Sequence, residues 1–125
     1  TTNHILFKCP LAVFGWCVIR DALNLVSLPN NLWECMSLLK DRKKFKPWIS
    51  LIGGVCWAIW IIRNDWVFEN ILVKSPLYVV YKSLSFIQKW RILLKEEDQE
   101  LLGGWCEAIR IKLYQVRPHV LPASL

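Results

Sequence analysis

Apolar residues recur three and four positions apart along most of the chain, the spacing that places them on one face of an α-helix. Five segments show this spacing: 11–25, 32–39, 48–68, 76–94 and 96–116. Only the stretch from Ile5 to Phe7 suits a short strand. The pattern predicts an all-α fold, a small irregular bundle of about five helices around a central helix rich in tryptophan.

Residues that start or stop helices lie at the expected places. Asn30 or Asn31 can cap the second helix, and Ser75 can cap the fourth, because their side-chain oxygens accept hydrogen bonds from free backbone N–H groups. Pro118 and Pro122 are expected to end the regular structure, since proline removes an N–H and clashes with the preceding turn.

A basic connector separates the second segment from the third. The stretch 41–47 carries four cations and a proline, and both features favour an exposed loop. Its cations are Arg42, Lys43, Lys44 and Lys46. These residues form either a solvated linker or a functional patch, which would contact phosphate groups or serve as a nuclear import signal. The expected division of the chain is 1–25 with the first helix, 26–47 with a short helix and the linker, 48–118 with the remaining helices, and a disordered end at 119–125.

The central segment also has to be weighed as a membrane span. Trp48 to Ile62 is a run of fifteen uncharged residues, whereas a bilayer span needs about twenty. Arg63 to Asp65 interrupts the run before apolar residues resume on the same helix. The interruption favours a buried core helix, with a membrane segment as the weaker alternative.

Composition narrows the partners and the compartment. Sixteen Lys and Arg against ten Asp and Glu give a formal charge of +6, which favours nucleic acid or anionic lipid as a partner. The eight tryptophans must be buried or face a partner. Five cysteines without a C-x-x-C pair predict buried, reduced thiols rather than disulfides, and hence a reducing compartment, the cytoplasm or nucleus.

Two clusters could carry chemistry. His4 and Cys9 are both good zinc ligands, but a structural zinc site needs four. On the third helix, Trp57, Trp60, Asn64 and Phe68 are expected to share one face.

Arg63 lies one residue round from that face, where it could stack on Trp60 or Trp66 or pair with a carboxylate. We expect the aromatic stripe to be core rather than a ligand site. Nucleotide-binding glycine motifs, paired carboxylates and a serine–histidine arrangement are missing from the sequence, so no enzymatic activity is expected.

The same two clusters resemble segments of plant non-LTR (LINE-type) retrotransposon reverse transcriptases. Thr2 to Pro10, with Ala12 and Trp16, is similar to the end of their zinc-binding region, where an H-L-F-x-x-C-P segment precedes a helix that carries a tryptophan. Trp57 to Asn64, with Phe68, resembles their downstream W-x-I-W-x-x-R-N-x-x-x-F segment. The matches cover the chain to about residue 70, and the segment that follows resembles the tail of one subset.

The resemblance implies a C-terminal, non-enzymatic remnant of such a polyprotein. His4 and Cys9 match the third and fourth zinc ligands of the family, whose first two cysteines and catalytic domains would precede Thr1. The intact parent would bind zinc, and its zinc region would bind template RNA or DNA. No cofactor is expected in this chain alone. The alternative functions are a helical module that binds protein through a tryptophan-rich face and, less favoured, a membrane-associated protein.

Overall fold

The computed structural model describes residues 3–25, 27–31, 33–34, 45–69 and 75–120, without the side chains of residues 68–69 and 117–120. This part of the chain contains five helices and no strand, which confirms the predicted all-α fold. They are η1 (His4–Lys8), α1 (Pro10–Leu23), α3 (Phe45–Glu69), α4 (Leu77–Arg91) and α5 (Glu96–Val120).

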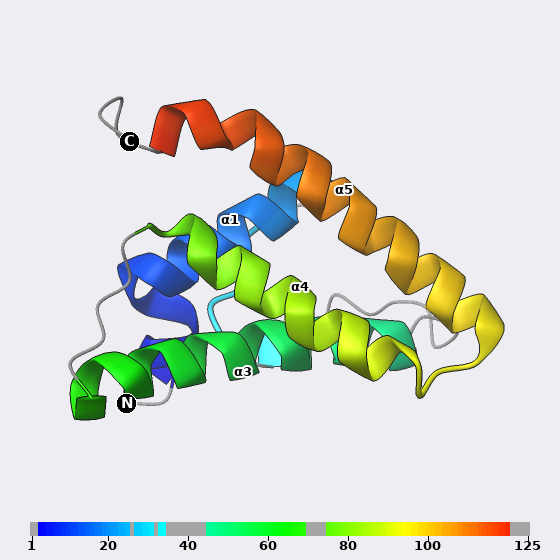
Figure 1. The fold of residues 1–125 in the computed structure, drawn as a ribbon, viewed down its shortest axis with the longest axis horizontal. Coiled ribbons are helices and arrows are strands. Elements are labelled where there is room, and N and C mark those ends of the chain that lie inside the picture. The colour runs from blue at the N-terminus through cyan, green and yellow to red at the C-terminus, as the bar shows by residue number, and fades with distance from the viewer. Residues whose placement is uncertain (1–2, 26, 32, 35–44, 70–74, 121–125) are drawn as a thin grey trace.

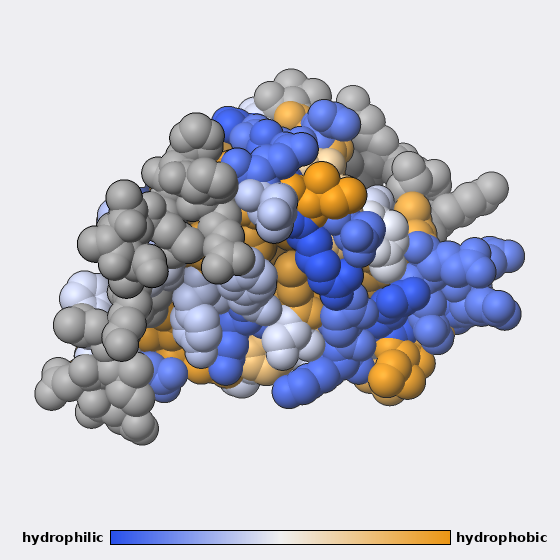
Figure 2. All heavy atoms as spheres, turned by 45° about the horizontal axis from the view of Figure 1, so that its top comes forward, coloured by the Kyte–Doolittle hydropathy of each residue, from blue (hydrophilic) through white to orange (hydrophobic). Residues whose placement is uncertain are grey.

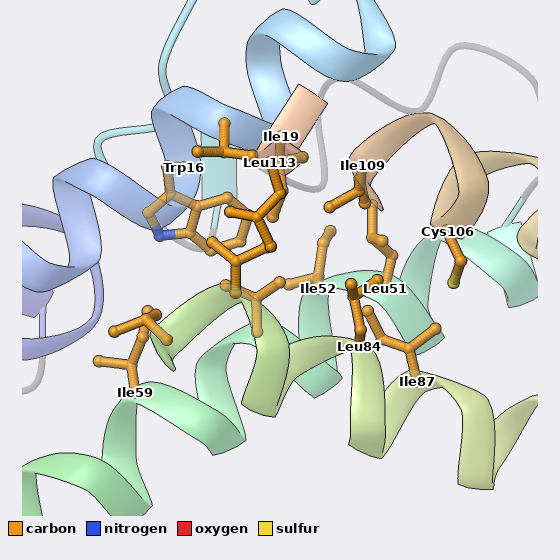
Figure 3. Close-up of a cluster of buried hydrophobic side chains, with 14 of the residues drawn as sticks. Trp16, Ile19, Leu51, Ile52, Ile59, Leu84, Ile87, Cys106, Ile109 and Leu113 are labelled. Atoms are coloured by element: carbon orange, nitrogen blue, oxygen red, sulfur yellow. The ribbon is translucent and has the colours of Figure 1, made fainter. Parts of the chain in front are cut away.

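The helices surround one hydrophobic core. α3 and α4 lie side by side with opposite chain directions, and α5 crosses them obliquely and contacts α1 (Figure 1). Side chains from α1, α3, α4 and α5 point toward a common centre (Figure 3). The side on which α5 comes forward is mostly hydrophilic in its described part, with hydrophobic groups in separate patches (Figure 2).

A glycine allows the closest approach between α3 and α4. A β-carbon at Gly54 would lie 2.5 Å from Cγ1 of Ile87, which is itself fully buried. No carbon atom tolerates such a distance, so any larger residue at position 54 would have to push the two helices apart. Gly54 thus helps α3 to pack on α4, although glycine has a low intrinsic propensity for the helix.

The predicted cap at Asn31 is confirmed, whereas α4 begins after Pro76, which occupies the cap position and forms no side-chain cap hydrogen bond. The Asn31 side-chain oxygen accepts a hydrogen bond from the Glu34 N–H at 2.8 Å, and the Ser75 hydroxyl accepts one from the Leu77 N–H at 3.3 Å. Residues 32 and 35–39, the rest of the predicted second helix, lie outside the described residues.

The strand expected at Ile5 to Phe7 is wrong, because these residues belong to the single π-helical turn η1. The Trp16 indole donates a hydrogen bond of 2.8 Å to the Leu6 carbonyl, and its ring stacks on Phe7 at 5.5 Å. The apolar stretch is therefore satisfied by packing on α1 rather than by pairing with another strand.

Two predicted boundaries are also wrong. Residues 45–47, expected in the basic connector, form the start of α3, where Pro47 costs little because the first turn has no intrahelical partner for its N–H. α5 continues through Pro118 to Val120, since a proline in the last turn removes only one hydrogen bond from a long helix. Pro122 and the rest of 121–125 lie outside the described residues.

The fourth helix ends at Arg91, earlier than the apolar stripe suggested, and Leu94 lies in the following turn. Arg91 holds this turn together: its Nε donates a hydrogen bond of 2.7 Å to the Gln99 carbonyl on α5. The Gln99 side chain in turn donates one of 2.7 Å to the Leu94 carbonyl. The guanidinium lies over Gly103, where a β-carbon would come within 2.6 Å of it.

Candidate functional site

His4 and Cys9 of the first cluster and Arg63 of the second line one pocket, whereas Trp57, Trp60 and Asn64 do not belong to its lining. His4 and Cys9, at the two ends of η1, lie beside Arg63 and Trp66 of α3 and line a cavity of about 620 Å³. We call this cavity the α1–α3 pocket. Its other walls are mainly aliphatic side chains from η1, α3 and α4, among them Ile5, Ile59, Ile62 and Val79.

His4 and Cys9 do not fit a zinc site by themselves. The Cys9 thiol donates a hydrogen bond of 3.2 Å to the Ile5 carbonyl of its own turn. Within the described ranges, no three His, Cys, Asp or Glu residues come together in a way that could hold a metal ion. A closed tetrahedral site needs four ligands, so this part of the chain supplies too few donors for a structural zinc.

The tryptophans of the family-like segment on α3 are not core residues, contrary to expectation. Trp57 and Trp60 are 46% and 36% exposed, and Asn64 is partly exposed on the same stripe of the helix. The buried positions of α3 belong instead to its other face, with Leu51, Val55 and Ala58. The side chain of Phe68 lies outside the described part of the structure.

Arg63 makes neither of the contacts expected from the sequence. In the described part of the chain, it forms no hydrogen bond or ion pair, and its guanidinium lies over no aromatic ring. Trp66, one of the two rings on which Arg63 could stack, is 52% exposed at the pocket.

A row of alternating aromatic and cationic side chains runs along the outer side of α4. The Lys82 ammonium lies 5.9 Å from the ring centre of Tyr78 and 5.7 Å from that of Phe86, and the Lys89 ammonium lies 5.6 Å from Phe86. We call Tyr78, Lys82, Phe86 and Lys89 the α4 ladder. These distances are within the range of favourable cation–π attraction.

The α4 ladder continues onto α3. The Phe86 ring packs against Trp90 with ring centres 6.0 Å apart. Trp90 reaches across to α3, where a β-carbon at Gly53 would lie 3.3 Å from its ring. Gly53, Trp57 and Trp60 lie on one stripe of α3 by helical spacing, so the exposed tryptophans continue the stripe that meets Trp90.

The sequence interpretation missed the α4 ladder. It did not connect Lys82 and Lys89 of the fourth helix with Tyr78 and Phe86. The spacing Tyr-x3-Lys-x3-Phe-x2-Lys is visible in the sequence and would have revealed the row. Of the predicted basic patch, only Lys46 is described, as an exposed residue of α3; Arg42, Lys43 and Lys44 lie outside the described residues.

The described cysteines are free thiols, as expected, but only Cys106 is fully buried; Cys9, Cys17 and Cys56 are partly buried. Cys106 is buried, and desolvation raises its pKa, an effect that the positive charges of Arg110 and Arg91 partly oppose. Burial raises the pKa of the Cys56 thiol to about 11. Both thiols therefore stay protonated at neutral pH and are poor nucleophiles. Cys35 lies outside the described residues.

Among the described helices, α3 alone is long and apolar enough, over Phe45–Val67, to cross a membrane. Half of its most apolar stretch is buried inside the protein, in the core shared with α1, α4 and α5. A central core helix passes the same test of length and composition. The burial of half of this stretch of α3 is compatible with a core helix.

Comparison with known proteins gives no match: the chain resembles none of the family models, curated proteins or solved structures against which it was compared.

Proposed function

We propose that this chain binds single-stranded nucleic acid through the α4 ladder, as a non-enzymatic domain derived from a retroelement reverse transcriptase. The observation that carries the proposal is the row of rings and ammonium groups on α4. Proteins that bind single strands without reading sequence combine cations, which contact phosphates, with aromatic rings, on which bases stack.

The charge of α4 supports this proposal. The helix contains Lys82, Lys89 and Arg91 and no carboxylate, so no acidic side chain of its own repels a phosphate backbone. By contrast, α5 begins with Glu96, Glu97 and Asp98. The formal charge of +6 adds a long-range attraction for polyanions, which speeds their association.

The accessibility of the rings supports it as well. Tyr78 is 46% exposed at one end of the ladder, and Trp57 and Trp60 of the neighbouring helix α3 are 46% and 36% exposed. Rings that are held at one edge by packing and open at one face can accept a stacked base. Each such stack contributes about 1–3 kcal/mol to binding.

Fluorescence anisotropy with a labelled 20-nucleotide oligouridine tests the proposal. The variant K82Q/K89Q removes two charges from the ladder, and R110Q/K112Q removes two from α5 as a matched control. Because each phosphate contact contributes about −0.7 to the slope of log K against log salt for single strands, the ladder variant should flatten the slope by about 1.4. If both variants weaken binding equally, net charge alone is responsible and the ladder is not the site.

The rings are tested separately by Tyr78→Leu, which leaves every charge in place. Loss of one stacking surface should weaken oligouridine binding about tenfold or more with an unchanged salt slope. Tyr114→Leu on α5, where the ring is 75% exposed, is the control and should bind like the wild type.

A second candidate function is docking of a protein partner on the exposed tryptophans of α3. The exposure of Trp57 and Trp60 favours it, since large aromatic residues are enriched at the centres of protein interfaces. Light scattering of the purified chain distinguishes a self-associating module from a monomer. A monomer whose Trp57→Ala variant loses only nucleic-acid binding would contradict this candidate.

A further inference from the structure

The α1–α3 pocket contains an aliphatic surface and the guanidinium of Arg63, neither of which belongs to the proposed nucleic-acid site. Its volume of about 620 Å³ is in the range of small-molecule sites in proteins. It is formed by η1, the start of α1, α3 and the beginning of α4, which belong to two distant parts of the sequence. The pocket therefore forms only when these helices pack together.

The charge balance of the pocket is one-sided. Arg63 contributes a guanidinium, and none of the described residues that line the pocket carries a carboxylate. Arg63 is only partly exposed and has no ion pair within the described residues. A guanidinium is always charged at physiological pH, and apolar surroundings strengthen its attraction for an anion that has left water.

The other residues that line the pocket indicate which kind of ligand would fit it. Ile5, Ile59, Ile62 and Val79 supply aliphatic surface, and Trp66 supplies a ring at the exposed side. The described lining contains no side-chain amide or hydroxyl that could recognise the edge of a nucleobase or the hydroxyls of a sugar. The pocket thus offers the guanidinium of Arg63 and, at its exposed edge, the imidazole of His4, beside a large apolar wall.

We propose that the α1–α3 pocket binds an amphipathic monoanion, a carboxylate with an aliphatic chain, whose head group pairs with Arg63. A guanidinium presents two parallel N–H groups to the two oxygens of a carboxylate. The chain of the ligand covers the isoleucine wall and removes it from water. This site is independent of the α4 ladder, and its test has a separate readout.

The test is titration of the purified protein with octanoate, below the concentration at which it forms micelles, followed by calorimetry. Octanoate should bind one-to-one with a Kd on the order of 0.1 mM. Octanol shares the chain without the charge, and acetate shares the charge without the chain. Both should bind at least tenfold more weakly. Equal binding of octanoate and octanol, or no binding of octanoate, would overturn the proposal.

Variants then assign the charge to Arg63. Arg63→Gln should weaken octanoate about tenfold and leave octanol unchanged, since it removes one charge-assisted pair. Arg110→Gln, the same substitution on the exposed side of α5, should leave both unchanged. An unaltered octanoate affinity in a folded Arg63→Gln variant would refute the assignment.

A filling variant keeps the test decisive if Arg63→Gln does not fold. Ile5→Trp retains the guanidinium but occupies the apolar part of the pocket, so octanoate binding should be lost. If Ile5→Trp folds and still binds octanoate as tightly as the wild type, the ligand is not in this pocket and the proposal fails.

Discussion

Gly54 and Gly104 are both helical glycines, and the same substitution at the two positions should have opposite effects. Alanine at position 54 would place a β-carbon 2.5 Å from Ile87 Cγ1 and 3.4 Å from the Ile87 backbone nitrogen. Alanine at position 104 would meet no atom within 4 Å. The difference between the two variants therefore reports the tightness of the α3–α4 contact, because the gain in helix propensity is shared.

The expected magnitudes follow from these distances. Replacing glycine by alanine inside a helix stabilises it by about 1 kcal/mol, which Gly104→Ala should realise. Gly54→Ala has the same gain but adds an overpacking cost of about 1–3 kcal/mol, and it can relax only by separating two helices whose contact is fully buried. The variants should therefore differ by about 2 kcal/mol, or about 1 M in the midpoint of urea unfolding monitored by circular dichroism.

Gly54→Ala in an Ile87→Ala background provides the internal control. Ile87→Ala alone should cost about 2–5 kcal/mol, but with the isoleucine removed the Gly54→Ala penalty should disappear. If Gly54→Ala stabilises the wild-type protein as much as Gly104→Ala does, the two helices do not approach each other as described and the packing argument is refuted.

Three further predictions concern other contacts. Trp16→Phe should lower the free energy of unfolding by about 1–3 kcal/mol, because the Leu6 carbonyl loses its indole donor; an unchanged urea midpoint would contradict the packing of η1 on α1. Gly103→Ala should gain about 1 kcal/mol more in an Arg91→Ala background than in the wild type, since only the wild type holds a guanidinium 2.6 Å from the new β-carbon; additivity in urea unfolding would refute the contact. Burial raises the pKa of Cys56 from 9.0 to about 11, so between these pH values the folded state keeps a proton that the unfolded state loses. The contribution of Cys56 to the free energy of unfolding should therefore be complete below pH 9 and fall between pH 9 and pH 11. The fall should be smaller in Cys56→Ala when unfolding is measured across that range.

Periodicity in the sequence was sufficient to predict α1, α3, α4 and α5, but not η1. The apolar spacing in the segments now described as α1, α3, α4 and α5 has one physical cause, the need of each helix to bury one face, and that cause is local enough to be visible in the chain. The cap at Asn31 was predictable for the same reason, because a cap depends on residues two or three positions away.

Features that depend on other parts of the chain were not predictable. Ile5 to Phe7 has the composition of a strand, but a hydrogen bond from Trp16, ten residues past Leu6, makes it a helical turn. The tryptophans at 57 and 60 were expected in the core, because their spacing indicates a shared face without indicating which face. Which face of α3 is buried depends on the helices that pack against it. Gly54, for example, packs against Ile87 of α4, which is distant in the sequence.

The candidate sites also differ in whether they depend on local spacing or on distant parts of the chain. The sequence identified His4, Cys9 and Arg63 as residues of interest but could not show that η1 and α3 place them around one pocket. The α4 ladder, by contrast, lies on one helix and needs only local spacing, so it could have been found without a structure.

Photo-crosslinking tests the central proposal, the α4 ladder as a surface for single-stranded nucleic acid, most directly. The chain is irradiated with an oligouridine that contains 4-thiouridine, and the crosslinked peptides are identified by mass spectrometry. The α4 peptide that contains Tyr78 and Phe86 should carry most of the crosslinks, and K82Q/K89Q should reduce them. Crosslinks confined to α5, or an α4 yield that K82Q/K89Q leaves unchanged, would contradict the proposal.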